Sequence, residues 1–86
     1  MYQVYFATPR IARQLSKLPS IIEEHLLTAI QNLSQNPRPH GTEKLKGKLK
    51  GAWRVRVGDY RILYDIHDDD RKVVILEIGH RREIYR

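Results

Sequence analysis

Three arginines stand within one short stretch of this chain, WRVRVGDYRILY, which covers Trp53–Tyr64. Apolar residues alternate with Arg54 and Arg56 before Gly58–Asp59, and a second β-prone run carrying Arg61 follows. This pattern predicts two strands joined by a tight turn with glycine at its first position. A two-residue or a four-residue loop places Arg56 directly opposite Arg61, and directly paired residues share a face of the sheet.

The same pairing sorts the hairpin into two faces. Leu63 joins the three arginines on the face that we expect to be uncovered. The other face is continuously apolar and is the natural floor for helices; it comprises Trp53, Val55, Val57, Tyr60, Ile62 and Tyr64.

Arginine is always protonated and presents a planar fork of donors that suits phosphate. Like charges placed opposite each other destabilise a sheet, so the cluster suggests a bound anion. The alternative is a solvated polar face whose charge is balanced by Asp59, Asp65 and Glu77. The hairpin pattern by itself leaves both interpretations open.

The C-terminal stretch GHRREIYR adds a second group of candidate residues. Tyrosine and histidine can move protons, and arginine can neutralise charge that develops on a phosphate. A frayed basic terminus is the alternative interpretation. The candidates are His80, Arg81, Arg82, Tyr85 and Arg86.

The basic residues are concentrated rather than spread. The chain has 86 residues and a formal net charge of +6, which favours an anionic partner. Between Lys44 and Arg61 there are seven Lys or Arg residues, and the only acid is Asp59. Lysines that could extend the field around the hairpin are Lys44, Lys46, Lys48 and Lys50.

Other site classes have little support. The chain contains no cysteine, which excludes disulfides and thiolate metal sites and fits a reducing compartment. Its four histidines lack metal-ligand spacing, and no phosphate-binding glycine loop is present. Neither a signal peptide nor a membrane-length apolar run is found, so we expect a cytoplasmic protein without metal or cofactor.

The first half of the chain predicts a strand and two helices. The strand covers Tyr2–Ala7, and a helix follows over Pro9–Leu18 with Thr8 as its N-cap. A second helix runs from Ser20, paired with Glu23 in a capping box, to about Gln35 before NPRP. Its apolar stripe consists of Ile22, Leu26, Ala29, Ile30 and Leu33.

The second half predicts strands alone. A short strand interrupted by glycine is expected within TEKLKGKLKG, followed by the hairpin, a DDDR turn and the strand KVVILEI. The fold class is therefore α+β, in the order β-α-α-β-β-β-β, with the helical hairpin packed on one face of a mainly antiparallel sheet. One domain spans residues 1–86.

The stretches LKGKLKGAWRVRVGDYRILYDI and VVILEIGHRREIYR resemble the RelE branch of the RelE/ParE superfamily of toxins from type II toxin–antitoxin pairs. The likeness spans nearly the whole chain. It implies a ribosome-dependent endoribonuclease, an mRNA interferase that cuts mRNA in the ribosomal A site. In such enzymes the substrate's 2′-hydroxyl attacks the scissile phosphate and leaves a cyclic phosphate.

The resemblance also implies roles for individual residues. Arg54 and Arg56 match two basic positions of the first hairpin strand, where the best-known members carry lysine. Arg61 matches the phosphate clamp, Arg81 the residue that stabilises the leaving group or acts as an acid, and Tyr85 the tyrosine that stacks on a base or activates the 2′-hydroxyl. His80, beside Arg81, could share acid–base work.

The implied partners are the ribosome, mRNA and a RelB-like antitoxin with an acidic or amphipathic segment, in a hetero-oligomer. Two alternatives belong to other functional classes. One is a ParE-like toxin that inhibits DNA gyrase without cutting RNA, and the other is a catalytically degenerate protein that only binds its antitoxin. The basic and tyrosine residues favour the nuclease over both.

Overall fold

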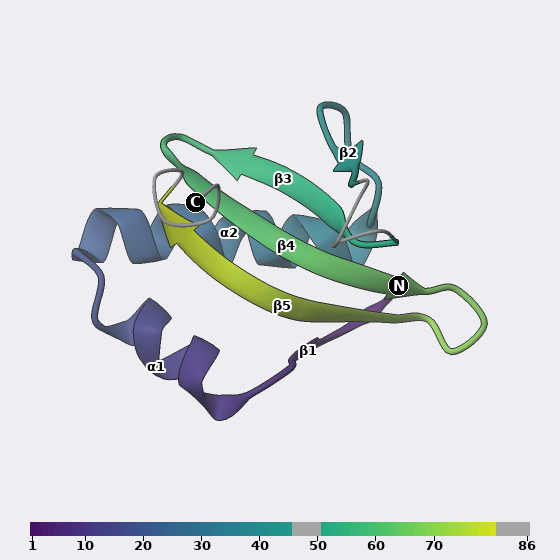
Figure 1. Cartoon of the computed structure of the whole chain (residues 1–86), viewed down its shortest axis with the longest axis horizontal. Helices are drawn as coiled ribbons and strands as arrows, with labels where there is room; N and C mark the ends of the chain where they lie inside the picture. The colour runs from purple at the N-terminus through teal and green to yellow at the C-terminus, as the bar shows by residue number, and fades with distance from the viewer. Residues whose placement is uncertain (46–50, 81–86) are drawn as a thin grey trace.

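The computed structural model describes residues 1–45 and 51–80. Its helices and strands are β1 (Gln3–Phe6), α1 (Pro9–Ser16), α2 (Ser20–Gln35), β2 (Glu43–Lys44), β3 (Trp53–Val57), β4 (Tyr60–His67) and β5 (Lys72–His80). The five strands form one sheet in the order β1-β5-β4-β3-β2 (Figure 1). The predicted α+β class and element order are confirmed. Neither helix of the described residues is long and apolar enough to cross a membrane.

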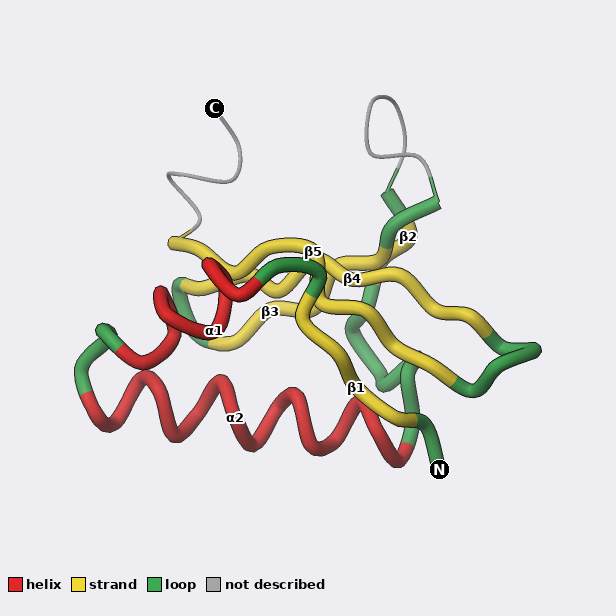
Figure 2. The backbone as a smooth tube through the Cα atoms, turned by 90° about the horizontal axis from the view of Figure 1, so that it is seen from below, coloured by secondary structure: helices red, strands yellow, loops and turns green. Residues whose placement is uncertain are grey.

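Both helices lie on the same side of the sheet, and no helix of the described residues covers the other face, which we call the helix-free face (Figure 2). The core fills the space between the two layers, and its buried residues come from α1, α2, β4 and β5. The predicted stripe of α2 supplies Leu26, Ile30 and Leu33 as buried residues, with Ile22 and Ala29 packed against them. The helix-facing side of the hairpin completes this core, as its alternating pattern predicted.

The first strand is shorter than the predicted Tyr2–Ala7, and its parallel pairing fits the predicted mainly antiparallel sheet. It covers Gln3–Phe6 and runs parallel to β5, with Gln3 opposite Lys72. The other pairings in the sheet are antiparallel. A parallel pair needs a long crossover connection, which here contains both helices and three strands.

The helix ends also correct the sequence analysis. α1 stops at Ser16 rather than Leu18, because Pro19 disfavours helical geometry in the residue before it. No capping box forms at α2: the helix begins at Ser20 itself, and the backbone carbonyl of Pro19 accepts bonds from the amides of Ile22 and Glu23, both at 2.9 Å. At the other end of the chain, β5 continues past the predicted KVVILEI to His80.

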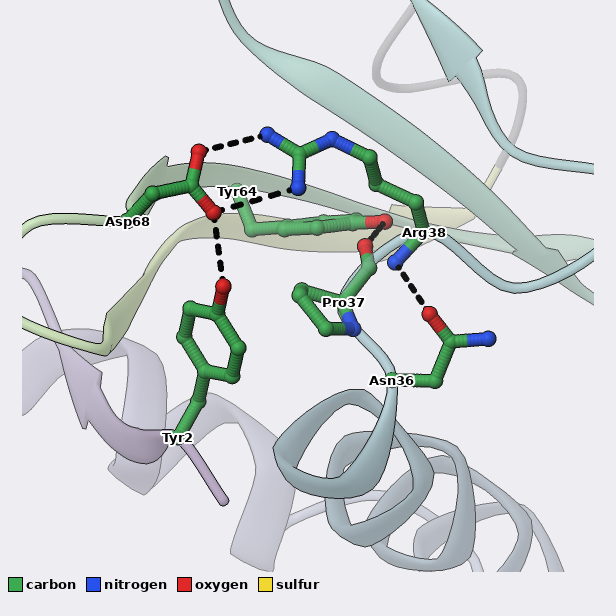
Figure 3. A network of polar contacts seen from close by, with 6 residues as sticks. All are labelled: Tyr2, Asn36, Pro37, Arg38, Tyr64 and Asp68. Atoms are coloured by element: carbon green, nitrogen blue, oxygen red, sulfur yellow. Dashed lines mark hydrogen bonds and ion pairs between the residues drawn. The ribbon is translucent and has the colours of Figure 1, made fainter.

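A polar network joins three segments that are distant in the sequence (Figure 3). The Tyr2 hydroxyl donates to Asp68 Oδ1 at 2.6 Å, and Arg38 Nη2 donates to Asp68 Oδ2 at 2.8 Å. Nearby, the buried Tyr64 hydroxyl donates to the carbonyl oxygen of Pro37 at 2.7 Å. These bonds tie the start of β1 and the α2–β2 connection to β4 and the β4–β5 turn.

The network shifts the pKa values of its members. Hydrogen bonds from Arg38 and then from Tyr2 lower the pKa of Asp68 to about 2. The bond to Asp68 is also the main cause of the raised pKa of the Tyr2 phenol. Burial raises the pKa of Tyr64 to about 12. Asp68 therefore stabilises the fold as the carboxylate.

This predicts a pH-dependent loss of stability in Asp68→Asn. Because the folded-state pKa of Asp68 lies below its unfolded value near 4, the stabilisation is full above pH ~4 and disappears as pH falls through ~2. Urea unfolding should be measured from pH 2 to pH 6. At pH 6 the free energy of unfolding should be higher for the wild type than for Asp68→Asn, and this difference should shrink toward pH 2. Asp70→Asn, in the same exposed turn, is the matched control and should show no such trend. A gap that stayed constant with pH would contradict the role of the carboxylate.

Candidate nucleic-acid interface

The hairpin pairs in the predicted register. Arg56 lies opposite Arg61, Arg54 opposite Leu63, and a two-residue turn at Gly58–Asp59 joins β3 to β4. Gly58 has φ +60° and Asp59 does not have a positive φ. A positive φ at the first turn position alone is the signature of a type II′ turn, which glycine there makes possible. The turn and the alternating pattern thus specify the same pairing.

Arg61 is buried, which corrects the expectation of a fully uncovered arginine face. Its side chain bends back to the turn, where Nη1 donates to the carbonyl oxygens of Tyr60 at 3.1 Å and Gly58 at 3.3 Å. Only 7% of Arg61 is exposed, and its neighbour on this face, Leu63, is 2% exposed. The turn carbonyls therefore hold one guanidinium in place before any ligand arrives.

Arg54 forms an ion pair with Glu43, which lies directly opposite on β2. The Arg54 side chain is 11% exposed and that of Glu43 is 59% exposed. The sequence analysis missed Glu43 because the glycine-interrupted stretch after it gave no reliable register for β2. The positive charge of Arg54 is thus balanced by Glu43. The sequence analysis had considered only Asp59, Asp65 and Glu77 for that role.

Arg56 differs from its two neighbours. Its side chain is exposed, and it makes no hydrogen bond or ion pair with any residue in 1–45 or 51–80. Because Arg61 is directly opposite on β4, the two guanidiniums belong to the same patch of the helix-free face. This patch contains one fixed and one solvated cation, which is an arrangement suited to an anion.

Lys44, at the end of β2, lies beside the aromatic ring of Trp53. Its Nζ is 5.9 Å from the ring centroid, and Arg38 Cζ is 5.2 Å from the same centroid. Cations at these distances are attracted to the ring, so Trp53 helps to position Lys44 near the start of β3, the strand that carries Arg54 and Arg56. The other lysines of the predicted field, Lys46, Lys48 and Lys50, lie outside the described residues.

His80 is not brought together with the arginines. It pairs with Tyr60, and their rings meet edge to face with centroids 5.5 Å apart. Tyr60 packs against the core on the helix side of the sheet, whereas Arg61 pairs with Gly79 on the other side. Successive residues of a strand point to opposite faces, so His80 and Arg61 project away from each other. The tail candidates Arg81, Arg82, Tyr85 and Arg86 lie outside the described residues.

The two guanidiniums of the patch suit the binding and neutralisation of a phosphate rather than the transfer of a proton. Guanidiniums stabilise negative charge without giving up a proton. Gly79, which the sequence analysis did not single out, faces Arg61 and adds no side chain next to it. No group of three or more potential metal ligands occurs among residues 1–45 and 51–80.

Comparisons with known proteins agree on one family. A family model for the ParE toxin of the type II toxin–antitoxin system parDE matches residues 5–85. Toxin RelG of Mycobacterium tuberculosis is 41% identical over 86 residues, covering 99% of this chain and 97% of that protein. Toxin RelE of the same organism is 35% identical over 80 residues, covering 92% of this chain and 81% of that protein.

Solved structures agree with the sequence relatives. The toxin–antitoxin complex RelBE2 of M. tuberculosis contains a chain that superposes with a TM-score of 0.80 at 37% identity, covering 93% of this chain and 98% of that one. A chain of the archaeal RelE–RelB complex of Pyrococcus horikoshii also has a TM-score of 0.80, at 28% identity, with 93% and 94% covered. The helical hairpin on a five-stranded sheet is thus the fold of these toxins.

The opposition of Arg56 and Arg61 predicts that the patch is maintained at a cost in stability. Arg56→Gln removes one of two like charges and should raise the free energy of unfolding by about 0.2–1 kcal/mol at low salt. The gain should shrink in 0.5 M salt, where screening is strong. Arg10→Gln, on the exposed side of α1, serves as the control and should leave stability within about 0.5 kcal/mol. A salt-independent effect of Arg56→Gln would show that charge repulsion is not its cause.

Proposed function

This chain belongs to the ParE toxin family of type II toxin–antitoxin systems, and we propose that it is a ribosome-dependent endoribonuclease that cleaves mRNA and so stops translation. The observation that carries the proposal is the pair formed by Arg56 and Arg61 on the helix-free face. The names of the curated relatives, RelG and RelE, support the nuclease branch of the superfamily.

In the proposed reaction, the 2′-hydroxyl of one nucleotide attacks the adjacent phosphorus. A new P–O bond closes a 2′,3′-cyclic phosphate, the bond to the 5′-oxygen breaks, and the leaving oxygen takes a proton. Arg61 binds the phosphate, and Arg56 contacts it from the neighbouring strand. Both guanidiniums stabilise the negative charge that develops on the phosphoryl oxygens. Arg54, which forms an ion pair with Glu43, lies next to this pair on the same strand.

In this proposal the net proton transfer is from the attacking 2′-hydroxyl to the leaving 5′-oxygen, and residues of the tail assist it. Arg81 stabilises the negative charge on the leaving oxygen, and Tyr85 helps to activate the 2′-hydroxyl or stacks on a base. His80 is the less favoured acid or base, because its partner Tyr60 faces the helices. The substrate supplies its own nucleophile, so the proposed mechanism uses no metal ion.

We further propose that the chain acts in the cytoplasm, on ribosomes, and is neutralised by a RelB-like antitoxin encoded by a neighbouring gene. The solved relatives in the two superposed complexes are bound to antitoxins of this kind. Lys44 and the lysines that follow it, with Arg82 and Arg86, would contact ribosomal RNA and mRNA. Phosphate contacts of this type weaken as salt rises.

Cleavage assays on a defined mRNA test the nuclease proposal directly. The wild type should generate new 3′ ends when ribosomes are present, and Arg61→Ala should cut about 10²–10³-fold more slowly because one preorganised charge is lost. Arg10→Ala, on the opposite side of the sheet, should cut like the wild type and controls for general loss of positive charge. Thermal unfolding of both variants checks that each is folded.

Two outcomes would overturn the assignment. Intact mRNA on ribosomes in the presence of the wild type would reject the nuclease, and inhibition of DNA supercoiling by the same preparation would then support the gyrase alternative. Normal cutting by folded Arg61→Ala would remove Arg61 from the site.

A further inference from the structure

A groove lies between α2 and β3, beside the arginines of the hairpin. It has a volume of about 280 Å³. Its floor is apolar and includes Val55 and Val57 of β3, which pack against the core. A groove near the lower end of the size range of small-ligand pockets suits one flat ring rather than a folded segment. Its rim is polar and comprises side chains of α2 and of the α2–β2 connection: His25, Thr28, Asn32 and His40.

The polar side chains of this rim have unused hydrogen-bonding groups. His25, Thr28 and Asn32 follow one another at intervals of three and four residues, so they form one stripe on the exposed side of α2. Neither they nor His40 form a side-chain hydrogen bond or ion pair within residues 1–45 and 51–80. Imidazole, hydroxyl and amide groups around an apolar floor suit an unstacked nucleobase, which is bound by stacking and by hydrogen bonds to its edge.

Arg56 belongs both to the groove and to the arginine patch. It lines the groove, and it lies directly opposite Arg61 on β4. The other side of Arg56 is open, because β2 pairs only with the first two residues of β3 and no further strand of the described residues lies there (Figure 1). A ligand with a phosphate at the arginines can therefore pass around this edge into the groove.

The backbone of Arg56 adds a donor and an acceptor at the same edge. The Leu45 amide donates to the Ala52 carbonyl at 2.8 Å, so the backbone groups of Ala52 point toward the β2 side of β3. Backbone groups alternate in direction along a strand, and Arg56, four residues later, points the same way. Its amide and carbonyl bond to no other backbone group of the described residues. Arg56 thus presents a guanidinium and a backbone amide to one ligand.

We propose that the groove binds the base of the RNA nucleotide adjacent to the phosphate held by Arg56 and Arg61; this inference rests on the proposed nuclease function. The imidazoles of His25 and His40 contact the ring of the base. Asn32 hydrogen-bonds to its edge, because a side-chain amide offers a donor and an acceptor side by side. The groove thereby selects the sequence that is cut.

The lining of the groove favours RNA over a protein segment. It contains one cation, Arg56, and no acid, which suits the negative charge of a nucleotide. A docking surface for a protein segment requires contiguous exposed apolar side chains. The large apolar residues that are exposed in the described chain lie outside this groove; they are Met1, Tyr5, Phe6, Ile21 and Leu27.

NMR with short RNAs tests the base site without ribosomes and without cutting. The RNAs are single-stranded, carry 2′-O-methyl groups that block cutting, and are compared with matched RNAs that lack one base. The complete RNA should bind about tenfold more tightly, as expected when one base stacks. It should also shift the imidazole signals of His25 and His40 more than the abasic RNA does. His67, at the far end of β4, is the internal control and should not distinguish the two RNAs.

Two neighbouring amide variants test the selectivity of cutting on ribosomes. Asn32→Ala removes the contact to the edge of the base, whereas Gln31→Ala removes an exposed side chain that lines a different groove. Asn32→Ala should lower the share of cuts at the sites preferred by the wild type by about fivefold, and Gln31→Ala should reproduce the wild-type distribution. A merely structural role of Asn32 would lower all cuts in proportion. Urea unfolding checks that both variants are folded.

Three results would overturn the inference. The first is equal affinity for RNAs with and without the base, or unchanged signals of His25 and His40. The second is the same distribution of cuts by folded Asn32→Ala and Gln31→Ala. The third is a response of the two histidines to the antitoxin but not to RNA, which would assign the groove to a protein. If the wild type cuts no mRNA, the nuclease proposal fails, and the NMR comparison still decides whether the base site exists.

Discussion

The pairing of β3 with β4 determines both the core and the arginine patch that we propose as the phosphate site. A shift of one residue in this register would exchange the two faces of the strand. It would then bury arginines under α2 and expose Ile62 and Tyr64, each of which is fully buried. The Gly58–Asp59 turn prevents that shift, and its carbonyl groups also fix the guanidinium of Arg61. The element that secures the fold is therefore the one that prepares the site.

The hairpin could be predicted because its signals are local in the sequence. Features that depend on contacts between distant residues could not be predicted in the same way. Alternation and a glycine turn are contained within twelve consecutive residues, so the register and the two faces followed from the sequence. The parallel pairing of Gln3 with Lys72 joins residues at opposite ends of the chain, and no local pattern encodes it. The ion pair between Arg54 and Glu43 depends on the register of a two-residue strand.

The polar network at the opposite end of β4 complements the hairpin turn. Small domains bury a limited apolar surface, and the ends of long strands are the first parts to open. Arg38 contacts both Asp68 and the ring of Trp53, so it links the β4–β5 turn to the first residue of β3. Tyr64 adds a buried bond to the same connection. The long β4 strand is thus secured at both ends, which keeps the arginine face in one shape.

Each cation of that face is accommodated in a different way. Arg54 forms an ion pair with Glu43, Arg61 donates hydrogen bonds to the turn carbonyls, and the side chain of Arg56 is exposed to solvent. Binding a phosphate therefore requires the ordering of one exposed side chain, since Arg61 loses its conformational freedom during folding. The repulsion between Arg56 and Arg61 exists in the free protein and is relieved when an anion lies between them. Both effects favour a ligand with concentrated negative charge, and they do so most strongly when that charge increases, as it does in the transition state of phosphoryl transfer.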